Sequence, residues 1–501
     1  MLALPLWGWL GAPFVSVVDN PFIGGQGWAA AEVAGALASG RWPDPVSSAG
    51  FPGVRAARFL GWPVLLAGVI AVPVLGAGLW VQLAAWAGLA LGAGAAAWVF
   101  GPPRGGLRAA AAGVVFGLAP VAVGALASGQ LENTQTWLVP GLVAAVGRAR
   151  GAAGALGAGA AGLLAGLASP YLGMIGVLAA VFVPRRRGAA LGAAVLGLAA
   201  AGAWLAPGEV DPLFAPRWTG GAEVAGDPAH AASLDGLLLG APAGQVRTLV
   251  LHLPYLGLPA VLAVLAWGPA RRAGAGALAA GAVLALGPRL RWAGELLRVG
   301  GASVALPAAV LAAGVPSLGQ SGQFYRFALL AAVGLARGVG RLPVAAAVLV
   351  AALSAADTLR VALPSGTPWP TRPLPVEAWA AWAADPQPGA VLHLPRRSPH
   401  TPPNHPVRLL GVAHHGRAVT DLPRSTPSAL ETPALALVER CTRAGGACPV
   451  PSRAQLAGTG VRYVVLDLDP SAERETLARR LRAAWGEPDG AAAGLWWWHL
   501  P

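Results

Sequence analysis

Residues 61–100 read GWPVLLAGVIAVPVLGAGLWVQLAAWAGLALGAGAAAWVF and carry no charged side chain. About 20 apolar residues suffice for one helix to cross a bilayer, so this run is long enough for a helical pair. Seven further apolar runs lie at 109–128, 152–183, 188–206, 249–268, 273–287, 324–338 and 342–356. The run at 152–183 is also long enough for a pair. Together the runs predict a polytopic membrane protein with about nine to twelve spans.

The chain changes character near residue 357. Residues 1–356 contain only ten Asp and Glu, whereas residues 357–501 have the mixed composition of a water-soluble domain and hold both cysteines. Over the whole chain 11% of residues are charged, compared with about 25% in soluble domains. We therefore expect a mainly α fold. It consists of a transmembrane helical bundle over 1–356 and a small α/β soluble domain over 357–501.

The net charge of +13 comes entirely from arginines, because the chain has no lysine. Short arginine clusters lie between the apolar runs, which is the pattern of cytoplasmic loops. Nucleic-acid binding would need a basic stripe on a soluble face and is disfavoured.

If the arginine clusters are cytoplasmic, the remaining loops fall outside the cytoplasm. These are 19–58 with a surface helix at 27–39, 129–137, the acidic loop 207–248, the connection 288–322, and the tail. If the assignments of both flanking loops hold, residues 61–100 cross the membrane an odd number of times. The first run, at 2–18, is near the shortest length for a span and lacks the charged start of a cleaved signal peptide.

The tail alternates between strand and helix patterns. Strands are expected at 390–395 and 461–469, a helix at 471–485, and a closing strand in the last residues, GLWWWHLP. Cys441 and Cys448 enclose a short loop in this outside domain. A disulfide between them would persist in an oxidising compartment, and the alternative is a pair of free thiols.

Asp19 is the first candidate for chemistry, because it directly follows the first apolar run. A carboxylate there could act as general base on an acceptor hydroxyl, or help to hold a metal or pyrophosphate-like group. The alternative is a helix-end aspartate in an Asp-Asn-Pro turn. Glu32 and Asp44 are the nearest further acids and could assist.

Other candidates lie at the mouths of later runs. Glu132, in LENTQ, is the one acid between residues 45 and 208, and it suits binding of a metal or acceptor. Arg326, in QFYRFALL, could grip a phosphate with its guanidinium fork or serve as a plain interfacial anchor. Arg289 and Arg291 could bind phosphate in the same way. His252, Tyr255 and Tyr325 could line an acceptor cavity or anchor the chain at the membrane interface.

The motifs of the tail are better explained by folding than by chemistry. Asp467 and Asp469 form a DxD at the end of a strand, without a nucleotide-binding fold around it. Six of the eight histidines lie in the tail, but none falls into a metal-binding spacing. Trp496 to Trp498 fit a closing strand that packs on the core.

The chain has a characteristic order of features. A run ending in Asp19 is followed by a surface helix, many spans, an outside LALGPRLRWAG…YRF segment and a tail with VLHLP…HHGR…GVRYVVLDLD. This order resembles that of the GT-C-like bacterial membrane glycosyltransferases that carry a C-terminal outside domain. The resemblance implies a protein of the bacterial inner membrane with that domain outside the cytoplasm. It also implies transfer of a sugar from a polyprenyl-phosphate carrier to an envelope glycan, lipid or protein acceptor. By position the acidic residue central to that transfer maps to Asp19.

One departure from the resemblance concerns metal. Many relatives have a paired acidic motif in the first outside loop, whereas here Asn20 follows Asp19, so a divalent metal such as Mg or Mn is not assured. Two other classes stay open. One is a non-catalytic membrane protein whose outside domain binds a partner, and the other is a transporter or flippase. An enzyme should bring Asp19, Glu132 and Arg326 to one cavity.

Overall fold

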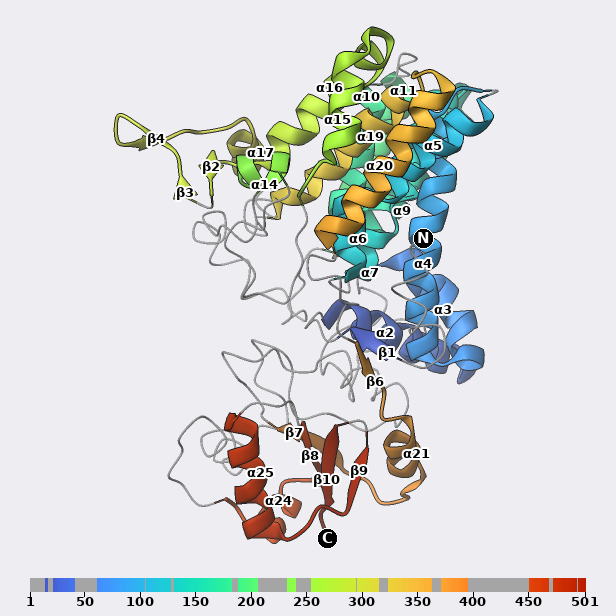
Figure 1. Ribbon diagram of the computed structural model, residues 1–501. Coiled ribbons are helices and arrows are strands. Elements are labelled where there is room, and N and C mark those ends of the chain that lie inside the picture. Colours follow the sequence, from blue (N-terminus) through green and yellow to red (C-terminus); the bar gives the residue numbers. More distant parts are fainter. Residues whose placement is uncertain are drawn as a thin grey trace.

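The protein is described from a computed structural model (Figure 1). The structure describes residues 14–16, 21–40, 61–103, 105–127, 130–182, 188–205, 232–239, 254–293, 295–314, 323–362, 371–394, 450–467, 472–492 and 494–501. Helices dominate as far as residue 362, and a small sheet with helices follows. The expected fold class, a helical membrane bundle plus a small α/β domain, is therefore confirmed.

The helices of the bundle vary widely in length. They are α2 (Pro21–Ala38), α3 (Trp62–Leu75), α4 (Ala77–Phe100), α5 (Gly106–Gly117), α6 (Pro120–Ala127), α7 (Leu131–Thr134), α8 (Leu138–Arg148), α9 (Gly151–Ala168), α10 (Pro170–Val181), α11 (Gly188–Leu205), α14 (Leu234–Leu239), α15 (Leu258–Ala266), α16 (Gly268–Ala285), α17 (Ala308–Gly314), the 3₁₀ helix η3 (Phe324–Phe327), α19 (Ala328–Val339) and α20 (Val344–Ala362).

Three of the described helices, α4, α9 and α20, are long and apolar enough to cross a membrane. The helices α5 and α6 would make a fourth span if they form one span bent by 53°. Other apolar helices, including α3, α8, α10 and α11, are shorter than a full span. Both runs expected to hold a helical pair do so, as α3 with α4 and α9 with α10. Of the first pair, α4 alone has spanning length, and the total number of spans stays a prediction.

The bend between α5 and α6 follows from Pro120, which begins α6. Proline has no N–H to continue the hydrogen-bond ladder, so nearby carbonyl groups need other donors. The Thr358 hydroxyl of α20 supplies one by donating to the carbonyl oxygen of Leu118 at 3.0 Å. A side chain of a neighbouring helix thus satisfies a backbone group that the bend exposes, as a span in lipid requires.

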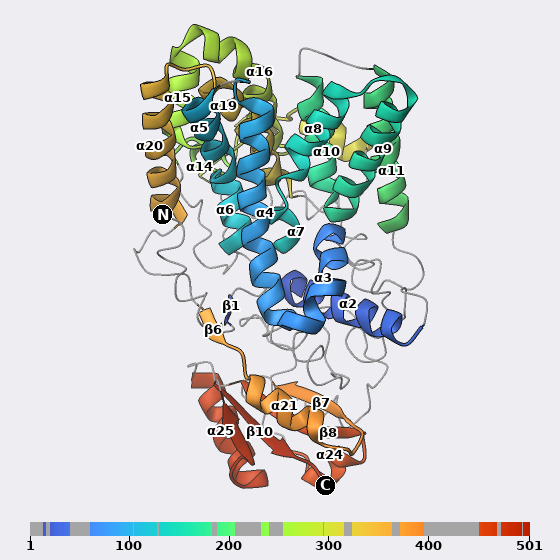
Figure 2. The ribbon, with the colours of Figure 1, turned by 90° about the vertical axis from the view of Figure 1, so that its right-hand side faces the viewer.

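Glycine allows the closest helix contacts of the bundle. Figure 2 shows α9 beside α11. A Cβ added at Gly197 of α11 would overlap the carbonyl of Gly159 and lie 2.8 Å from the backbone nitrogen of Leu163, both on α9. Small residues at such positions let two backbones approach closely, which is how helices associate in lipid.

A short arm leaves the bundle between α16 and α17. It consists of two hairpins, β2 (Arg291–Trp292) with β3 (Glu295–Leu296) and β4 (Arg298–Val299) with β5 (Ala302–Ser303). Figure 1 shows the arm projecting away from the helices.

The tail forms a four-stranded sheet in the order β7-β8-β10-β9, from β7 (Ala390–Leu394), β8 (Val461–Asp467), β9 (Gly490–Ala492) and β10 (Leu495–His499). The pair β7 and β8 is parallel and the other pairs are antiparallel. The helices of the tail are α21 (Val376–Ala384), α24 (Arg453–Ala457) and α25 (Ala472–Trp485). The four elements expected from the sequence correspond to β7, β8, α25 and β10. Trp498 is fully buried and packs edge-on to Trp485 of α25, as expected for a closing strand.

A polar contact ties the segment after α21 to the sheet. The Tyr463 hydroxyl donates to Asp385 Oδ2 at 2.7 Å, the backbone N–H of Gln387 donates to Asp385 Oδ1 at 3.0 Å, and Arg462 Nε donates to Oδ2 at 3.2 Å. These donors hold the pKa of the Asp385 carboxyl well below its usual range.

Two links concern the ends of the bundle. Strand β1 (Phe14–Ser16) pairs with β6 (Thr371–Pro373), so the segment before the first helix contacts the start of the tail. The helix expected at 27–39 corresponds to α2, which begins earlier, at Pro21, and ends at Ala38; Gly40 then adopts the left-handed conformation. Helix α20 continues to Ala362, past residue 356. The boundary between the two domains therefore stays a prediction.

Candidate functional site

A polar segment lies buried among the apolar helices between α6 and α8. Gln130, Glu132, Asn133 and Thr134, in and just before α7, are each at most 7% exposed. Buried polar side chains are normally hydrogen-bonded, since losing water without a new partner is unfavourable. The partners of this segment come from η3 and from the start of α10, far away in sequence.

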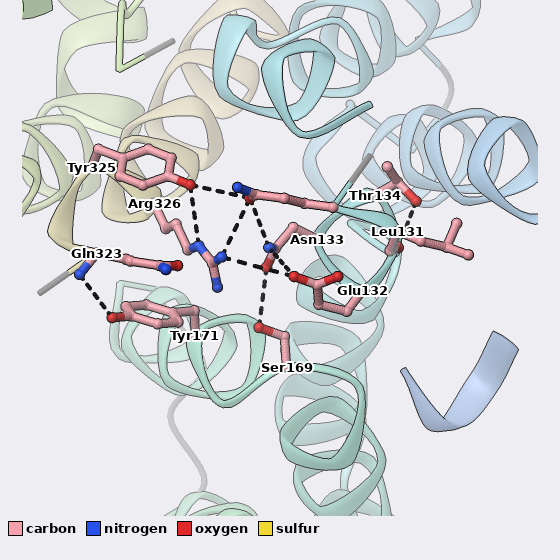
Figure 3. A network of polar contacts seen from close by, with 10 residues as sticks. Leu131, Glu132, Asn133, Thr134, Ser169, Tyr171, Gln323, Tyr325 and Arg326 are labelled. Atoms are coloured by element: carbon pink, nitrogen blue, oxygen red, sulfur yellow. Dashed lines mark hydrogen bonds and ion pairs between the residues drawn. The ribbon is translucent and has the colours of Figure 1, made fainter. Parts of the chain in front are cut away.

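Arg326 of η3 reaches this segment. Its Nη2 lies 3.8 Å from Glu132 Oε1 and donates to Gln130 Oε1 at 3.3 Å, and its Nε donates to the Tyr325 hydroxyl at 3.4 Å. Its guanidinium carbon lies 4.8 Å from the centroid of the Tyr171 ring of α10. Figure 3 shows these side chains converging from three separate parts of the bundle. The two residues that the sequence analysis proposed as acid and phosphate contact are therefore an ion pair.

Asn133 organises the carboxylate side of the network. Its Nδ2 donates to Glu132 Oε1 at 2.8 Å and to Gln130 Oε1 at 3.1 Å, and its Oδ1 accepts from the Ser169 hydroxyl at 3.1 Å. The Tyr325 hydroxyl also donates to Gln130 Oε1, at 3.1 Å. These bonds orient Glu132 so that Oε1 faces Arg326 and Asn133 (Figure 3).

Three buried polar atoms around the network have no hydrogen-bond partner among the residues that the structure describes. They are Glu132 Oε2, Thr136 Oγ1 and Gln323 Oε1. An unpaired buried polar atom costs about 1–3 kcal/mol, and a ligand at this place would relieve that cost. Both the carboxylate and the amide oxygen can accept a hydrogen bond from a hydroxyl group.

A small recess with a cavity volume of about 20 Å³ opens beside Thr136 and Arg326, enough for about one water molecule in this conformation. Its polar lining comes from α7, α10 and η3, and its apolar lining from α6, α10 and α19: Gln130, Asn133, Thr136, Tyr171, Tyr325, Arg326, Val121, Ala122, Ala125, Leu172, Ile175 and Leu329. The recess thus combines a guanidinium, hydroxyl and amide groups with an apolar wall. That combination suits a ligand that carries a phosphate, hydroxyl groups and a hydrocarbon chain.

The other candidates divide into two groups. Asp19, Asp44, His252, Cys441 and Cys448 lie outside the described residues, and their roles and pairing stay predictions. The remaining candidates are described, and of these Tyr325 alone lines the recess. Glu32 is half-buried on α2, and Arg289 and Arg291 belong to the arm, where Arg291 is 5% exposed. The Tyr255 hydroxyl donates to Asp357 Oδ2 at 2.5 Å, while Tyr325 joins the network.

Sequence reasoning did not single out Gln130, Asn133, Ser169 or Tyr171. The segment 129–137 is expected from the sequence to be an outside loop that contains Glu132, so part of the signal was present. Ser169 and Tyr171 flank Pro170, which starts α10 in the middle of the long apolar run at 152–183. Polar residues at a proline break inside an apolar run were the signal that could have identified them.

The described residues contain no group of three or more His, Cys, Asp or Glu side chains able to hold a metal ion. Within that part of the chain, Glu132 supplies one carboxylate to the network.

No protein-family model matches the chain, and no curated protein matches it. The comparison with solved structures does give a result. The fold is similar to that of a mycobacterial arabinofuranosyltransferase. The cryo-EM structure of arabinofuranosyltransferase AftD from mycobacteria aligns with a TM-score of 0.50 and 16% sequence identity over 100% of this chain and 39% of the other. A mutant of that protein aligns with a TM-score of 0.47 and 18% identity, over 100% of this chain and 41% of the other. The likeness is one of fold, and this chain spans about two fifths of the length of AftD.

Proposed function

We propose that the chain is an integral membrane glycosyltransferase that moves a sugar from a polyprenyl-phosphate donor to an envelope glycan, lipid or protein acceptor. The observation that carries this proposal is the convergence of Glu132 and Arg326, 3.8 Å apart, beside a partly apolar recess. Both residues had been proposed from the sequence for this chemistry, although almost two hundred positions separate them. The fold similarity to an arabinofuranosyltransferase supports the same class and suggests a pentofuranose as the sugar.

The roles follow from the chemistry of each group. The guanidinium of Arg326 would bind the phosphate of the donor, because it offers several N–H donors in a planar fork. The apolar wall, formed by residues such as Val121 and Leu329, would accept the first units of the hydrocarbon chain. The unpaired Glu132 Oε2 would accept a hydrogen bond from a hydroxyl of the sugar or acceptor. Asp19 would be the general base, taking the proton of the acceptor hydroxyl as it attacks the anomeric carbon and the polyprenyl phosphate departs.

The buried ion pair also has a purely structural reading. A guanidinium and a carboxylate buried together can hold η3 against α7 without any ligand. That reading leaves unexplained the three unpaired polar atoms, Glu132 Oε2, Thr136 Oγ1 and Gln323 Oε1. We therefore favour a substrate site over a structural pair.

Asp19→Asn tests the proposed general base in cells. In a strain whose deletion is complemented by the wild-type gene, the variant should lose the envelope glycan that depends on this protein, because an amide cannot accept the acceptor's proton. Glycan composition is measured at matched levels of membrane protein. Full complementation by Asp19→Asn would remove Asp19 from the mechanism and favour a partner-binding role.

A further inference from the structure

A second, shallow crevice lies on the perimeter of the bundle, between α5, α15 and α20. It shares no lining residue with the recess of Arg326. Its walls are mainly apolar: Val114, Val115, Leu118, Pro120, Leu256, Gly257, Ala260, Ser354, Ala355 and Thr358. The two hydroxyl groups, on Ser354 and Thr358, both come from α20.

The helices around the crevice present a lipid-facing surface. Leu258 and Leu262 of α15 are 40% and 58% exposed, and Leu349 and Leu353 of α20 are 59% and 48% exposed. Helix α20 has the length and apolar composition of a span. Large exposed aliphatic side chains on such a helix would face lipid tails in a membrane. The natural occupant of the crevice is therefore a molecule of the bilayer.

Ser354 gives the crevice a specific polar group. The residue is 7% exposed, and its hydroxyl has no hydrogen-bond partner among the described residues. Serine within a helix usually donates to the carbonyl four residues earlier, and Ser354 does not. Thr358, one turn later, is already bonded to Leu118 at the bend. A hydroxyl that lines an apolar crevice and lacks a partner can donate to a carbonyl group of a ligand.

Arg360 lies six residues beyond Ser354, in the last turn of α20. Figure 1 shows this end of α20 beside α6. The Arg360 side chain is 63% exposed. Its Nε and Nη2 donate to Asp357 Oδ1 at 3.1 and 2.9 Å, and the Tyr255 hydroxyl donates to Oδ2. Asp357 thus accepts three hydrogen bonds, and the N–H groups of the Arg360 guanidinium that do not bind it are available to an anion.

We propose that this crevice binds a glycerophospholipid. One acyl chain would lie along the apolar wall, with its ester carbonyl accepting a hydrogen bond from Ser354 and its phosphate contacting Arg360. Over six helical residues the rise is about 9 Å, and the Arg360 side chain reaches back towards Ser354 as far as Asp357, three residues earlier. The polyprenyl phosphate of the proposed function has a phosphate and an apolar chain but no ester carbonyl. The two lipids are therefore distinguishable, and the inference does not depend on the proposed function.

The test is native mass spectrometry of the purified full-length protein titrated with palmitoyl-oleoyl phosphatidylglycerol and with its diether analogue, which lacks the ester carbonyls. In the wild-type protein, the first lipid to bind should have about fivefold higher affinity as the ester than as the ether. This difference corresponds to one hydrogen bond of about 1 kcal/mol. Ser354→Ala should bind the ester about fivefold more weakly than wild type and should no longer distinguish ester from ether. Ser303→Ala, in the arm, is the matched control and should behave as wild type.

The outcomes separate the alternatives. If Ser354→Ala weakens the binding of the ester and the ether lipid equally, or weakens the binding of neither, the hydrogen bond to the ester does not exist and the proposal is overturned. If farnesyl phosphate binds in a Ser354-dependent manner and displaces phosphatidylglycerol, the crevice is a polyprenyl site instead, which also overturns it. Ser354→Ala is expected to fold normally, because alanine is the better helix former; an unchanged melting temperature verifies this.

Discussion

Replacing Arg326 by glutamine should weaken the binding of farnesyl phosphate, a short polyprenyl phosphate, by about 10- to 100-fold, since a hydrogen bond to a charged group is worth about 1.5–3 kcal/mol. The guanidinium is buried next to Gln130, Tyr325 and Glu132 and borders the recess. A neutral side chain of similar length keeps some hydrogen bonding but not the charge. Binding is measured by titration of the purified protein in detergent.

The variant has a second effect that must be separated from the first. Removing one member of a buried ion pair leaves the other charge unpaired, which costs about 3–5 kcal/mol in stability. The double variant Glu132→Gln/Arg326→Gln removes both charges and should recover most of the melting temperature, yet it should still bind farnesyl phosphate weakly. Recovery of binding in the double variant would mean that the pair is structural. Arg341→Gln, at an exposed arginine beyond the other end of α19, is the charge-matched control.

Gly197→Ala should destabilise the bundle by about 2–3 kcal/mol, the cost of inserting a methyl group where there is no space. The added Cβ would overlap the carbonyl of Gly159 and approach the Leu163 nitrogen. Backbone atoms of a helix cannot move aside individually, so α9 and α11 would have to separate along their length. The measurement is the thermal unfolding of the purified protein in detergent, followed by tryptophan fluorescence.

Gly192→Ala on the same helix is the matched control. A Cβ at Gly192 would meet nothing within 4 Å, and alanine is favoured over glycine in a helix by about 1 kcal/mol. This control should therefore be neutral or slightly stabilising. Equal melting temperatures for the two variants would contradict the close packing of α9 on α11.

The broad architecture was predictable because the hydrophobic pattern dominates it. A run without charge such as 61–100 can satisfy its backbone in lipid only as helix, and β-branched residues in VRYVVLD favour a strand. Helix lengths were not predictable to the same degree. Pro120 and Pro170 begin new helices inside runs that read as continuous, and the bend at Pro120 depends on a hydroxyl from Thr358, distant in sequence.

The candidate site was predictable in part. Glu132 and Arg326 were identified because a lone acid and an arginine at the mouth of an apolar run need an explanation. Their contact was not predictable, since η3 and α7 meet only through the packing of the helices between them. Asn133 and Ser169 are uncharged and fit a loop or a helix cap equally well, so their part in the network required the structure.

The location of these charges also bears on the transporter class. A transporter would be expected to hold charged residues within its spans. Glu132 and Arg326 lie in the short helices α7 and η3, outside the three described helices of spanning length. The segment of Glu132 nevertheless packs against the middle of α4, where Gly88 adjoins Thr134 and Gly92 adjoins Thr136, so the polar network lies beside a helix of spanning length.

The most direct test of the account is turnover by the purified wild-type protein in lipid nanodiscs. The substrate is a synthetic polyprenyl-phosphate-linked arabinofuranose, supplied with oligosaccharide acceptors of the envelope. We expect release of polyprenyl phosphate and extension of the acceptor by one sugar, both reduced at least about 100-fold in Arg326→Gln. Absence of turnover with every pentose and hexose donor, from a protein that still binds farnesyl phosphate, would contradict the transferase and leave a lipid-binding membrane protein in its place.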